Sequence, residues 1–111
     1  MPVRSTRRRY LWLNINTSVL LTSDNLNDLL ERKIIFLYGV IGDVKIGYRL
    51  IEFNPEEKNA IIRCNHNKLN DMRATLAQIS KFDGNPIRID VILVSGTIKS
   101  LRNKMKIRKP Q

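Results

Sequence analysis

The sequence predicts an α+β fold, in which a four-stranded antiparallel sheet, built in β-α-β-β-α-β order, is followed by a basic C-terminal helix. Apolar residues alternate with polar ones in stretches typical of strands, and they recur at three- and four-residue intervals in stretches typical of helices. In addition, 111 residues, 42% of them hydrophobic, suffice for one domain with a core and are too few for two. We therefore expect a single domain over residues 1–111.

The first strand and the first helix are predicted over residues 9–16 and 25–38. The strand alternates between two sides: Leu11, Leu13 and Ile15 form the first, and Tyr10, Trp12 and Asn14 form the second. Four residues of N-cap type, 22–25, stand at the start of the helix. Gly39 follows the helix where a C-terminal cap belongs.

A β-hairpin is predicted next. Residues 44–53 are rich in strand formers, and residues 60–64 form a short apolar run. The residues between them have turn composition, because proline fixes φ and asparagine tolerates turn geometry; they are Asn54, Pro55, Glu56, Glu57, Lys58 and Asn59. Two strands joined by such a turn pair in antiparallel fashion.

A second helix and a fourth strand complete the predicted sheet. Asn65 and Asn67 can cap the helix, whose apolar face consists of Leu69, Met72, Leu76 and Ile79. A turn over 83–86 ends this helix. The strand that follows has one side formed by Ile87, Ile89, Val91 and Leu93. This order of elements is that of the ferredoxin-like (RRM-like) sandwich, in which the helices cover one face of the sheet.

Positive charge is concentrated at the two ends of the chain. The chain has 20 Lys+Arg and 10 Asp+Glu, for a net charge of +10, yet residues 10–98 hold equal numbers of acids and bases. Half of the bases lie in a basic N-terminal arm (1–9) and a basic C-terminal helix and tail (96–111), which contain no acid. They are Arg4, Arg7, Arg8, Arg9, Lys99, Arg102, Lys104, Lys106, Arg108 and Lys109. Such ends suit a nucleic-acid backbone, because cationic side chains displace its condensed counterions.

The final helix is the most informative segment for function. Its basic stripe, made of Lys99, Arg102, Lys106 and Lys109, runs beside an apolar stripe made of Ile98, Leu101 and Met105. One face can therefore pack on the domain while its neighbour meets phosphates. The residues at its start, Ser95, Gly96 and Thr97, could bind a phosphate or could serve only as helix caps.

The two aromatic residues of the first strand allow a second kind of RNA contact. Tyr10 and Trp12 share one side of the strand and could stack on a base. We favour instead their burial under the terminal helix or in a protein interface. RNA binding would then depend mainly on charge and helix geometry.

The residues offer little support for a catalytic or metal site. One Cys and one His cannot supply the ligands of a zinc site, and the glycines do not form a phosphate-binding loop. Cys64 and His66 could form a nucleophile pair, but a core thiol and a loop imidazole are the preferred interpretation. We therefore expect no cofactor bound by the chain itself.

Compartment and membrane contact can also be judged from the sequence. A single cysteine excludes an internal disulfide and indicates a reducing compartment, so a cytoplasmic location is expected. No apolar run reaches the length of a membrane helix, and we expect no membrane partner. The Arg-rich first twenty residues resemble a targeting peptide only weakly, because Asn14 and Asn16 interrupt the apolar stretch.

Three stretches together carry a resemblance to a known family. They are Arg9-Tyr10, Ile61-Ile62-Arg63-Cys64 and Val94-Ser95-Gly96-Thr97-Ile98-Lys99, with Met72-Arg73 and Leu76 between the last two. Over about residues 7–104 the chain resembles the ribonuclease P protein component 2 family of archaea and eukaryotes. The Val94–Lys99 stretch is the most specific part, and the short chain without an acidic tail is similar to the archaeal form.

The resemblance implies an accessory subunit of the ribonucleoprotein that removes the 5′ leader from precursor tRNA. In that family the RNA subunit carries out catalysis with magnesium ions, and the protein binds and stabilises the catalytic domain of the RNA. The implied partners are the ribonuclease P RNA and protein component 3, with precursor tRNA met indirectly and self-association left open. Arg63 and Arg73 match the family's motif and are candidates for RNA or partner contact.

Three alternatives stay open at this stage. A general RNA-binding protein of ribosomal or nucleic-acid-packaging type would carry the same charge without depending on a partner subunit. A small ferredoxin-like enzyme with basic tails would turn over substrate on its own, whereas the resemblance implies no activity for the isolated chain. The basic ends could also be merely solvated termini.

Overall fold

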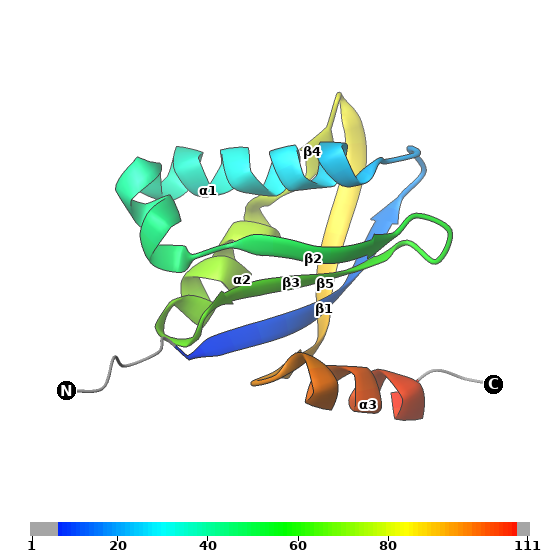
Figure 1. Cartoon of the computed structure of the whole chain (residues 1–111). Coiled ribbons are helices and arrows are strands. Elements are labelled where there is room, and N and C mark those ends of the chain that lie inside the picture. Colours follow the sequence, from blue (N-terminus) through cyan, green and yellow to red (C-terminus); the bar gives the residue numbers. More distant parts are fainter. Residues whose placement is uncertain (1–6, 109–111) are drawn as a thin grey trace.

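The computed structural model describes residues 7–108 and contains every strand and helix expected from the sequence, with one additional strand (Figure 1). The strands are β1 (Arg8–Thr17), β2 (Arg49–Asn54), β3 (Asn59–Asn65), β4 (Lys81–Phe82) and β5 (Asn85–Ser95). The helices are α1 (Ser23–Ile46), α2 (Leu69–Gln78) and α3 (Ile98–Arg108), and a 3₁₀ turn, η1 (His66–Lys68), precedes α2.

The strands form one antiparallel sheet in the order β2-β3-β1-β5-β4. The expectation of four strands was therefore wrong, because the short β4 is added at the edge. Asp83 and Gly84 both have positive φ, 50° and 81°, which is the backbone of a tight two-residue hairpin turn. This turn folds Lys81 and Phe82 back onto Pro86 and Asn85, whereas residues 83–86 were predicted only as the turn that ends the second helix.

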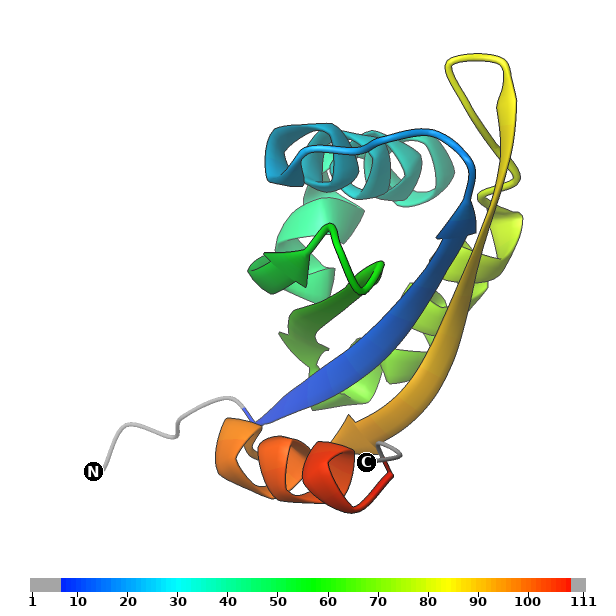
Figure 2. The same cartoon turned by 90° about the vertical axis from the view of Figure 1, so that its right-hand side faces the viewer.

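Helices cover both faces of the sheet. The larger core lies between the sheet and the helices α1 and α2, and it includes Leu13, Leu30 and Leu76. A smaller core lies on the opposite face, where Leu101 of α3 packs against Trp12 and Ile61. Figure 2 shows this arrangement, with α1 at the top of the view, α3 at the bottom and the long strands β1 and β5 running between them. The prediction of helices on one face thus holds for α1 and α2 only.

The predicted alternation is confirmed in β1 and is broken in β5. Leu11, Leu13 and Ile15 lie in the larger core, as expected. In β5 the pairing shifts, so that Leu93 faces Trp12 but Val91 faces Leu13. Ile92, the residue between them, forms a β-bulge. As a result Leu93 packs against the smaller core, whereas Val91 packs against the larger one.

The first helix is longer than predicted and bends at Gly39. Thr22 caps it, since the Thr22 Oγ1 accepts a hydrogen bond from the Asn25 backbone N at 3.1 Å. Gly39 has φ 76° and ψ 178°, so the helix is interrupted where the sequence predicted its end. Helical structure then resumes through Ile46 and ends at Gly47, whose φ of 64° is left-handed. The strand expected over 44–53 accordingly begins only at Arg49.

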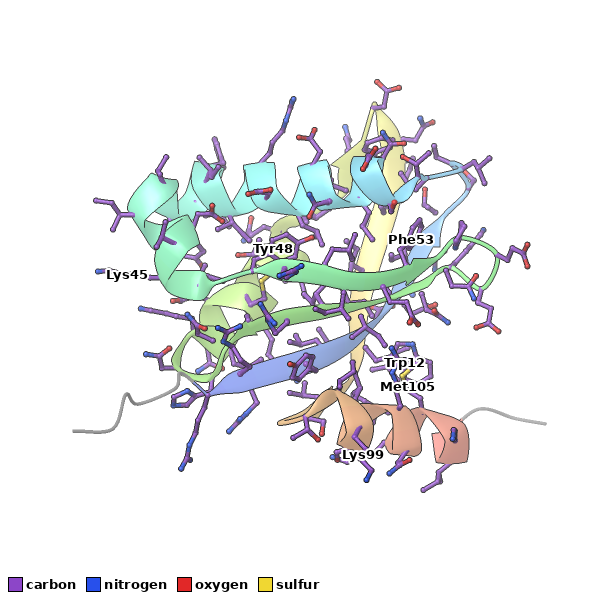
Figure 3. All side chains as sticks on the ribbon, viewed as in Figure 1. Trp12, Lys45, Tyr48, Phe53, Lys99 and Met105 are labelled. Carbon is purple, nitrogen blue, oxygen red and sulfur yellow. The ribbon has the colours of Figure 1, made fainter. Side chains whose placement is uncertain are left out.

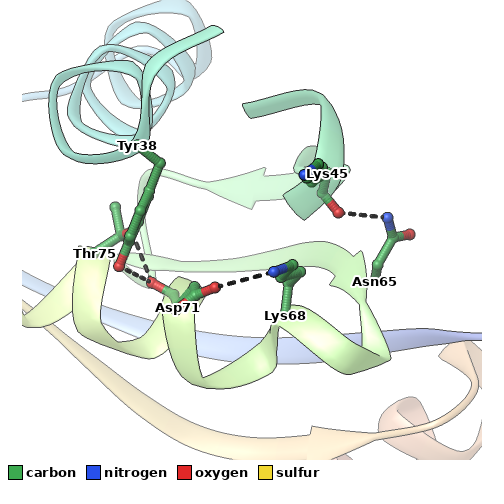
Figure 4. Close-up of polar contacts among 6 residues, drawn as sticks. All are labelled: Tyr38, Lys45, Asn65, Lys68, Asp71 and Thr75. Atoms are coloured by element: carbon green, nitrogen blue, oxygen red, sulfur yellow. Dashed lines mark hydrogen bonds and ion pairs between the residues drawn. The ribbon is translucent and has the colours of Figure 1, made fainter. Parts of the chain in front are cut away.

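Polar contacts tie α1, on both sides of its bend, to α2 and to the end of β3 (Figure 4). The Tyr38 hydroxyl donates to the backbone O of Asp71 at 3.3 Å, and the Asn65 side-chain amide donates to the backbone O of Lys45 at 2.9 Å. Asn65 was expected to cap the second helix and does not, because its side chain is used in this contact. The residue at the N-cap of α2 is Lys68, which makes no side-chain capping bond.

Candidate nucleic-acid interface

Helix α3 is held on the sheet by a small apolar core. Trp12 is 6% exposed and Leu101 is fully buried, and both contact Ile61 of β3. Figure 3 shows Met105 of α3 beside Trp12, between the helix and the sheet. The favoured interpretation of Trp12, burial under the terminal helix, is confirmed, and Trp12 is not available to stack on a base.

The start of α3 lies next to the N-terminal strand. The Thr97 hydroxyl accepts a hydrogen bond from the Ser100 backbone N at 3.1 Å, so Thr97 caps the helix, and Ser95 is 6% exposed. Gly96 is exposed, and a Cβ built on it would lie 3.5 Å from Nη1 of Arg9. The Arg9 Nη1 also donates to the backbone O of Arg8 at 3.0 Å. The fold therefore places the Arg9 side chain next to the Ser95–Thr97 segment, so both could contribute to one RNA-binding site.

The basic stripe predicted on α3 divides into two parts. Arg102 is tied to β2, because its Nη2 lies 3.0 Å from Oε1 of Glu52. Arg102 and Lys106 also border a groove of about 240 Å³ whose other side includes Glu52 and Glu57. The remaining lysines of the helix, Lys99 and Lys104, are exposed, and Figure 3 shows Lys99 on the side of α3 that faces away from the sheet. Arg102 thus has a structural partner, and Lys99, Lys104 and Lys106 are the exposed lysines of the helix.

A second basic feature lies on the face of the sheet beside α3. The cross-strand register sets Arg49 of β2 opposite Arg63 of β3, Arg63 opposite Tyr10 of β1, and Tyr10 opposite Ser95 of β5. Directly paired residues share a face of the sheet. Tyr10 packs against the smaller core beneath α3, so this row of four residues lies on the α3 side and ends where the helix begins.

Three arginines on this face form what we call the arginine strip: Arg8, Arg49 and Arg63. Arg8 is two residues from Tyr10 on β1, so it lies on the same side and diagonally across from Arg63. The Nε atoms of Arg8 and Arg63 are buried and have no hydrogen-bond partner among the described residues. Ion pairs within residues 7–108 join Arg32 to Asp28, Lys68 to Asp71, Arg88 to Asp90 and Arg102 to Glu52. The arginine strip therefore has no acidic partner in that part of the chain.

Other predicted RNA-binding residues are not brought to this surface. Arg73 is exposed on α2, which packs on the opposite face of the sheet from α3. Arg7 is exposed, and its backbone O accepts a hydrogen bond from the His66 N at 3.0 Å. Arg4 and Lys109 lie outside the described residues, and Arg108 is described only as the last residue of α3.

The geometry disfavours a nucleophilic site at Cys64. The thiol is fully buried, and this burial raises its pKa to about 11, although the charge of Arg9 acts in the opposite direction. The thiol is therefore protonated near neutral pH, and His66 is exposed with its Nδ1 3.3 Å from the backbone O of Arg7.

No cluster of three His, Cys, Asp or Glu side chains suited to a metal ion occurs among residues 7–108. Nor does any helix in that range have both the length and the apolar character to cross a membrane.

Comparison with known proteins decides the family. The Rpp14/Pop5 family matches residues 9–106, which is most of the chain. The chain belongs to the Rpp14/Pop5 family. This membership confirms the resemblance noted in the sequence, and it supports the expected role as an accessory subunit of ribonuclease P.

Curated relatives and a solved structure agree with membership of the Rpp14/Pop5 family. The chain is 30% identical to ribonuclease P protein component 2 of Pyrococcus horikoshii, over 93% of this chain and 86% of that protein. It is 29% identical to the protein of the same name from Methanobrevibacter smithii, over 89% of this chain and 88% of that protein. A chain in the structure of yeast ribonuclease MRP has a similar fold, with a TM-score of 0.67, 16% identity and coverage of 96% and 94% of the two chains.

The stretches that carry the resemblance to the Rpp14/Pop5 family meet in space. Arg9-Tyr10 lies on β1, Ile61–Cys64 on β3, and Val94–Lys99 at the junction of β5 and α3; both β3 and β5 pair with β1. Arg49 of β2 completes the same surface, although it was not among the residues predicted to bind RNA. The only sequence signal for Arg49 was its place in the strand predicted over residues 44–53, because the pairing with Arg63 depends on an irregularity of the register in β2.

Proposed function

We propose that this chain is an accessory protein subunit of ribonuclease P that binds the RNA subunit and stabilises its catalytic domain. The observation that carries the proposal is the basic surface on the α3 side of the sheet, formed by the arginine strip and the exposed lysines of α3, with the Ser95–Thr97 segment between them. It contains the family's matching stretches, and its arginines have no acidic partner among the described residues. The ferredoxin-like arrangement, with β4 as an addition, presents this surface on one face of the sheet.

The proposed mechanism is electrostatic. Folded RNA brings phosphates close together, and their mutual repulsion opposes the compact active form. Arginine and lysine side chains of this surface would lie between those phosphates and release the counterions condensed on them. The chain would act by positioning and charge neutralisation, while the RNA subunit carries out the cleavage with magnesium ions. We expect no cleavage by the isolated protein and no metal ion held by its own side chains.

A protein partner is part of the same proposal. Protein component 3 is assigned here to the apolar surface on the outer side of α1, where Phe36 is 78% exposed and Ile41 and Val44 are each 73% exposed. Large apolar side chains at this level of exposure, on both sides of the bend at Gly39, are typical of a surface covered by another protein. Self-association through the same surface would compete with this binding. A cytoplasmic location is expected for the whole particle.

Reconstitution of precursor-tRNA cleavage tests the proposal. The cognate RNA subunit is combined with protein component 3, with and without this chain, over a magnesium titration. We expect the chain to lower the magnesium requirement or to raise the cleavage rate only when the RNA subunit is present. If cleavage is indifferent to the chain although the chain still binds RNA, the protein is a general RNA-binding protein of ribosomal or packaging type.

A further inference from the structure

We infer that the arginine strip is a dedicated RNA phosphate site, in which Arg8, Arg49 and Arg63 of three adjacent strands hold the RNA backbone. The inference rests on the proposed function, since it takes RNA as the partner. It deepens that function by naming the three side chains that hold the RNA backbone on the face of the sheet, whereas the charge pattern of the sequence pointed to the two ends of the chain. It also adds Arg49, for which neither composition nor motif indicated a role.

The position of the three side chains follows from the strand register. Arg49 and Arg63 are directly paired across β2 and β3, and Arg8 is diagonal to Arg63 across β1 and β3. Neighbours of these residues confirm the face: Leu50, Ile62 and Cys64 all contact the larger core, so the arginines between or beside them point to the other side. On that side, helix α3 covers Trp12 and Ile61. This pair lies two residues along β1 and β3 from the pair Tyr10 and Arg63.

The strip is unfavourable without an anion. Like charges placed directly opposite in a sheet repel each other, and Arg49 and Arg63 are such a pair. In addition, the Nε–H groups of Arg8 and Arg63 are shielded from solvent and lack an acceptor among the described residues. A buried donor without an acceptor is unfavourable in a folded protein. A phosphate group supplies a negative charge and several acceptor oxygens to the guanidinium groups, so it offsets the repulsion between Arg49 and Arg63.

The shape of the basic surface favours a nucleic-acid backbone over an acidic side chain of a protein. The cross-strand row continues from Arg49 through Arg63 and Tyr10 to Ser95, where α3 begins with Lys99 in its first turn. Cationic side chains therefore stand at both ends of this row, Arg49 and Arg63 at one end and Lys99 beyond the other, with the uncharged Tyr10 and Ser95 between them. An extended RNA strand can present phosphates to both ends, whereas a single acidic side chain cannot. The planar guanidinium groups also suit bidentate contact with phosphate.

The experiment measures binding of the cognate ribonuclease P RNA by the full-length protein over a range of KCl concentrations. The test variant is the double substitution Arg49→Gln and Arg63→Gln. The matched control is Arg88→Gln, which removes an exposed arginine of β5 that is already paired with Asp90. Loss of two phosphate contacts should weaken binding by about tenfold or more at moderate salt and reduce the slope of log K against log salt by about 2. The control should bind as the wild type does.

Thermal unfolding of the free protein separates a binding site from a structural one. Because the substitutions remove the repulsion between Arg49 and Arg63 and the unsatisfied Nε–H of Arg63, the double variant should have a melting temperature equal to or above that of the wild type. If that variant fails to fold, the single variant Arg49→Gln replaces it, since Arg49 is exposed, with an expected slope change of about 1.

The outcomes distinguish this inference from the proposed function. Unchanged RNA binding by the double variant, together with weaker binding by a Lys99→Gln, Lys104→Gln variant, would overturn the arginine strip and leave the accessory-subunit function intact. Absence of RNA binding by the wild type would overturn the function itself. If RNA binding is unchanged but binding of protein component 3 is lost, the strip is a protein interface and the inference is wrong.

Discussion

Arg102 of α3 donates a hydrogen bond from its Nη2 to Oε1 of Glu52 on β2, at 3.0 Å. The pair joins the C-terminal helix to the edge strand of the sheet. Both side chains are about half exposed, 49% and 46%, so the ion pair contributes only about 0–1 kcal/mol to stability. Its larger consequence is for RNA binding, because Glu52 neutralises one cation of the proposed interface.

The first prediction concerns this neutralisation. We expect Glu52→Gln to increase the affinity for the RNA subunit severalfold, because it releases Arg102 and removes a negative charge from the basic surface. Glu56→Gln is the matched control, since it removes an equal charge from the exposed turn between β2 and β3 without touching Arg102. Filter binding at fixed salt measures both. Equal effects of the two substitutions would show that the affinity for RNA depends on net charge and not on the release of Arg102.

The second prediction concerns the attachment of α3. Trp12→Ala should destabilise the protein by about 3–5 kcal/mol, because it leaves a cavity beneath Leu101 and Ile61. Urea unfolding followed by circular dichroism gives this free energy. Leu20→Ala serves as the control, since Leu20 is 86% exposed and its truncation should change stability by less than about 0.5 kcal/mol. A small loss for Trp12→Ala would mean that α3 does not depend on this core.

The third prediction concerns the end of α1. A Cβ at Gly47 would lie 2.8 Å from the Asn65 Nδ2, the atom that donates to the backbone O of Lys45. Gly47→Ala should therefore be destabilising both through its φ of 64°, by about 1–2 kcal/mol, and through disruption of that hydrogen bond. Gly84→Ala has a similar φ of 81° but nothing within 4 Å of the added Cβ, so it isolates the backbone cost. Thermal melts should rank Gly47→Ala below Gly84→Ala, and the reverse order would contradict the clash.

The fourth prediction concerns pH. Burial raises the pKa of the Cys64 thiol from 9.0 to about 11 in the folded protein. Below pH 9 the thiol is protonated in both states, and its contribution to stability is complete. Between pH 9 and about 11 the unfolded chain releases this proton and the folded chain keeps it, so stability falls as pH rises.

Comparison with Cys64→Ala isolates this titration, because other groups lose protons in the same range. The free energy of unfolding should decline more steeply between pH 9 and 11 for the wild type than for Cys64→Ala, measured by urea titration at each pH. The native thiol should also react slowly with a disulfide reagent at pH 8, and unfolding should accelerate the reaction. Parallel pH profiles for the two proteins would show that the thiol is not shielded.

Much of the architecture could be predicted from local patterns. The alternation in β1 correctly separated Leu11, Leu13 and Ile15 from Tyr10 and Trp12, and the turn between β2 and β3 was found by composition. Gly39 does interrupt the helical structure, but the predicted end of the helix there was wrong, because the helix resumes and continues through Ile46. These features succeed because each is encoded within a few consecutive residues.

The edge strand β4 was not predicted from the sequence because it is very short. Its two residues, Lys81 and Phe82, are too few for alternation to be visible, although Asp83-Gly84 carries a local signal for a tight turn. The bulge in β5 was not predicted either, because the residue types from Val91 to Val94 do not indicate which residue is left unpaired.

The candidate site separates local information from information that arises on folding. The excess of positive charge, its concentration at the two ends and the stretches typical of the family can all be found in the sequence. The placement of Arg49 opposite Arg63 arises only in the folded sheet. Counting back from the hairpin turn would place Leu50 there, but an irregularity between Leu50 and Glu52 shifts the register by one residue. Periodicity within a strand tells which side chains share a face, whereas the partner across the sheet depends on hydrogen bonds between distant segments, and these form only in the folded chain.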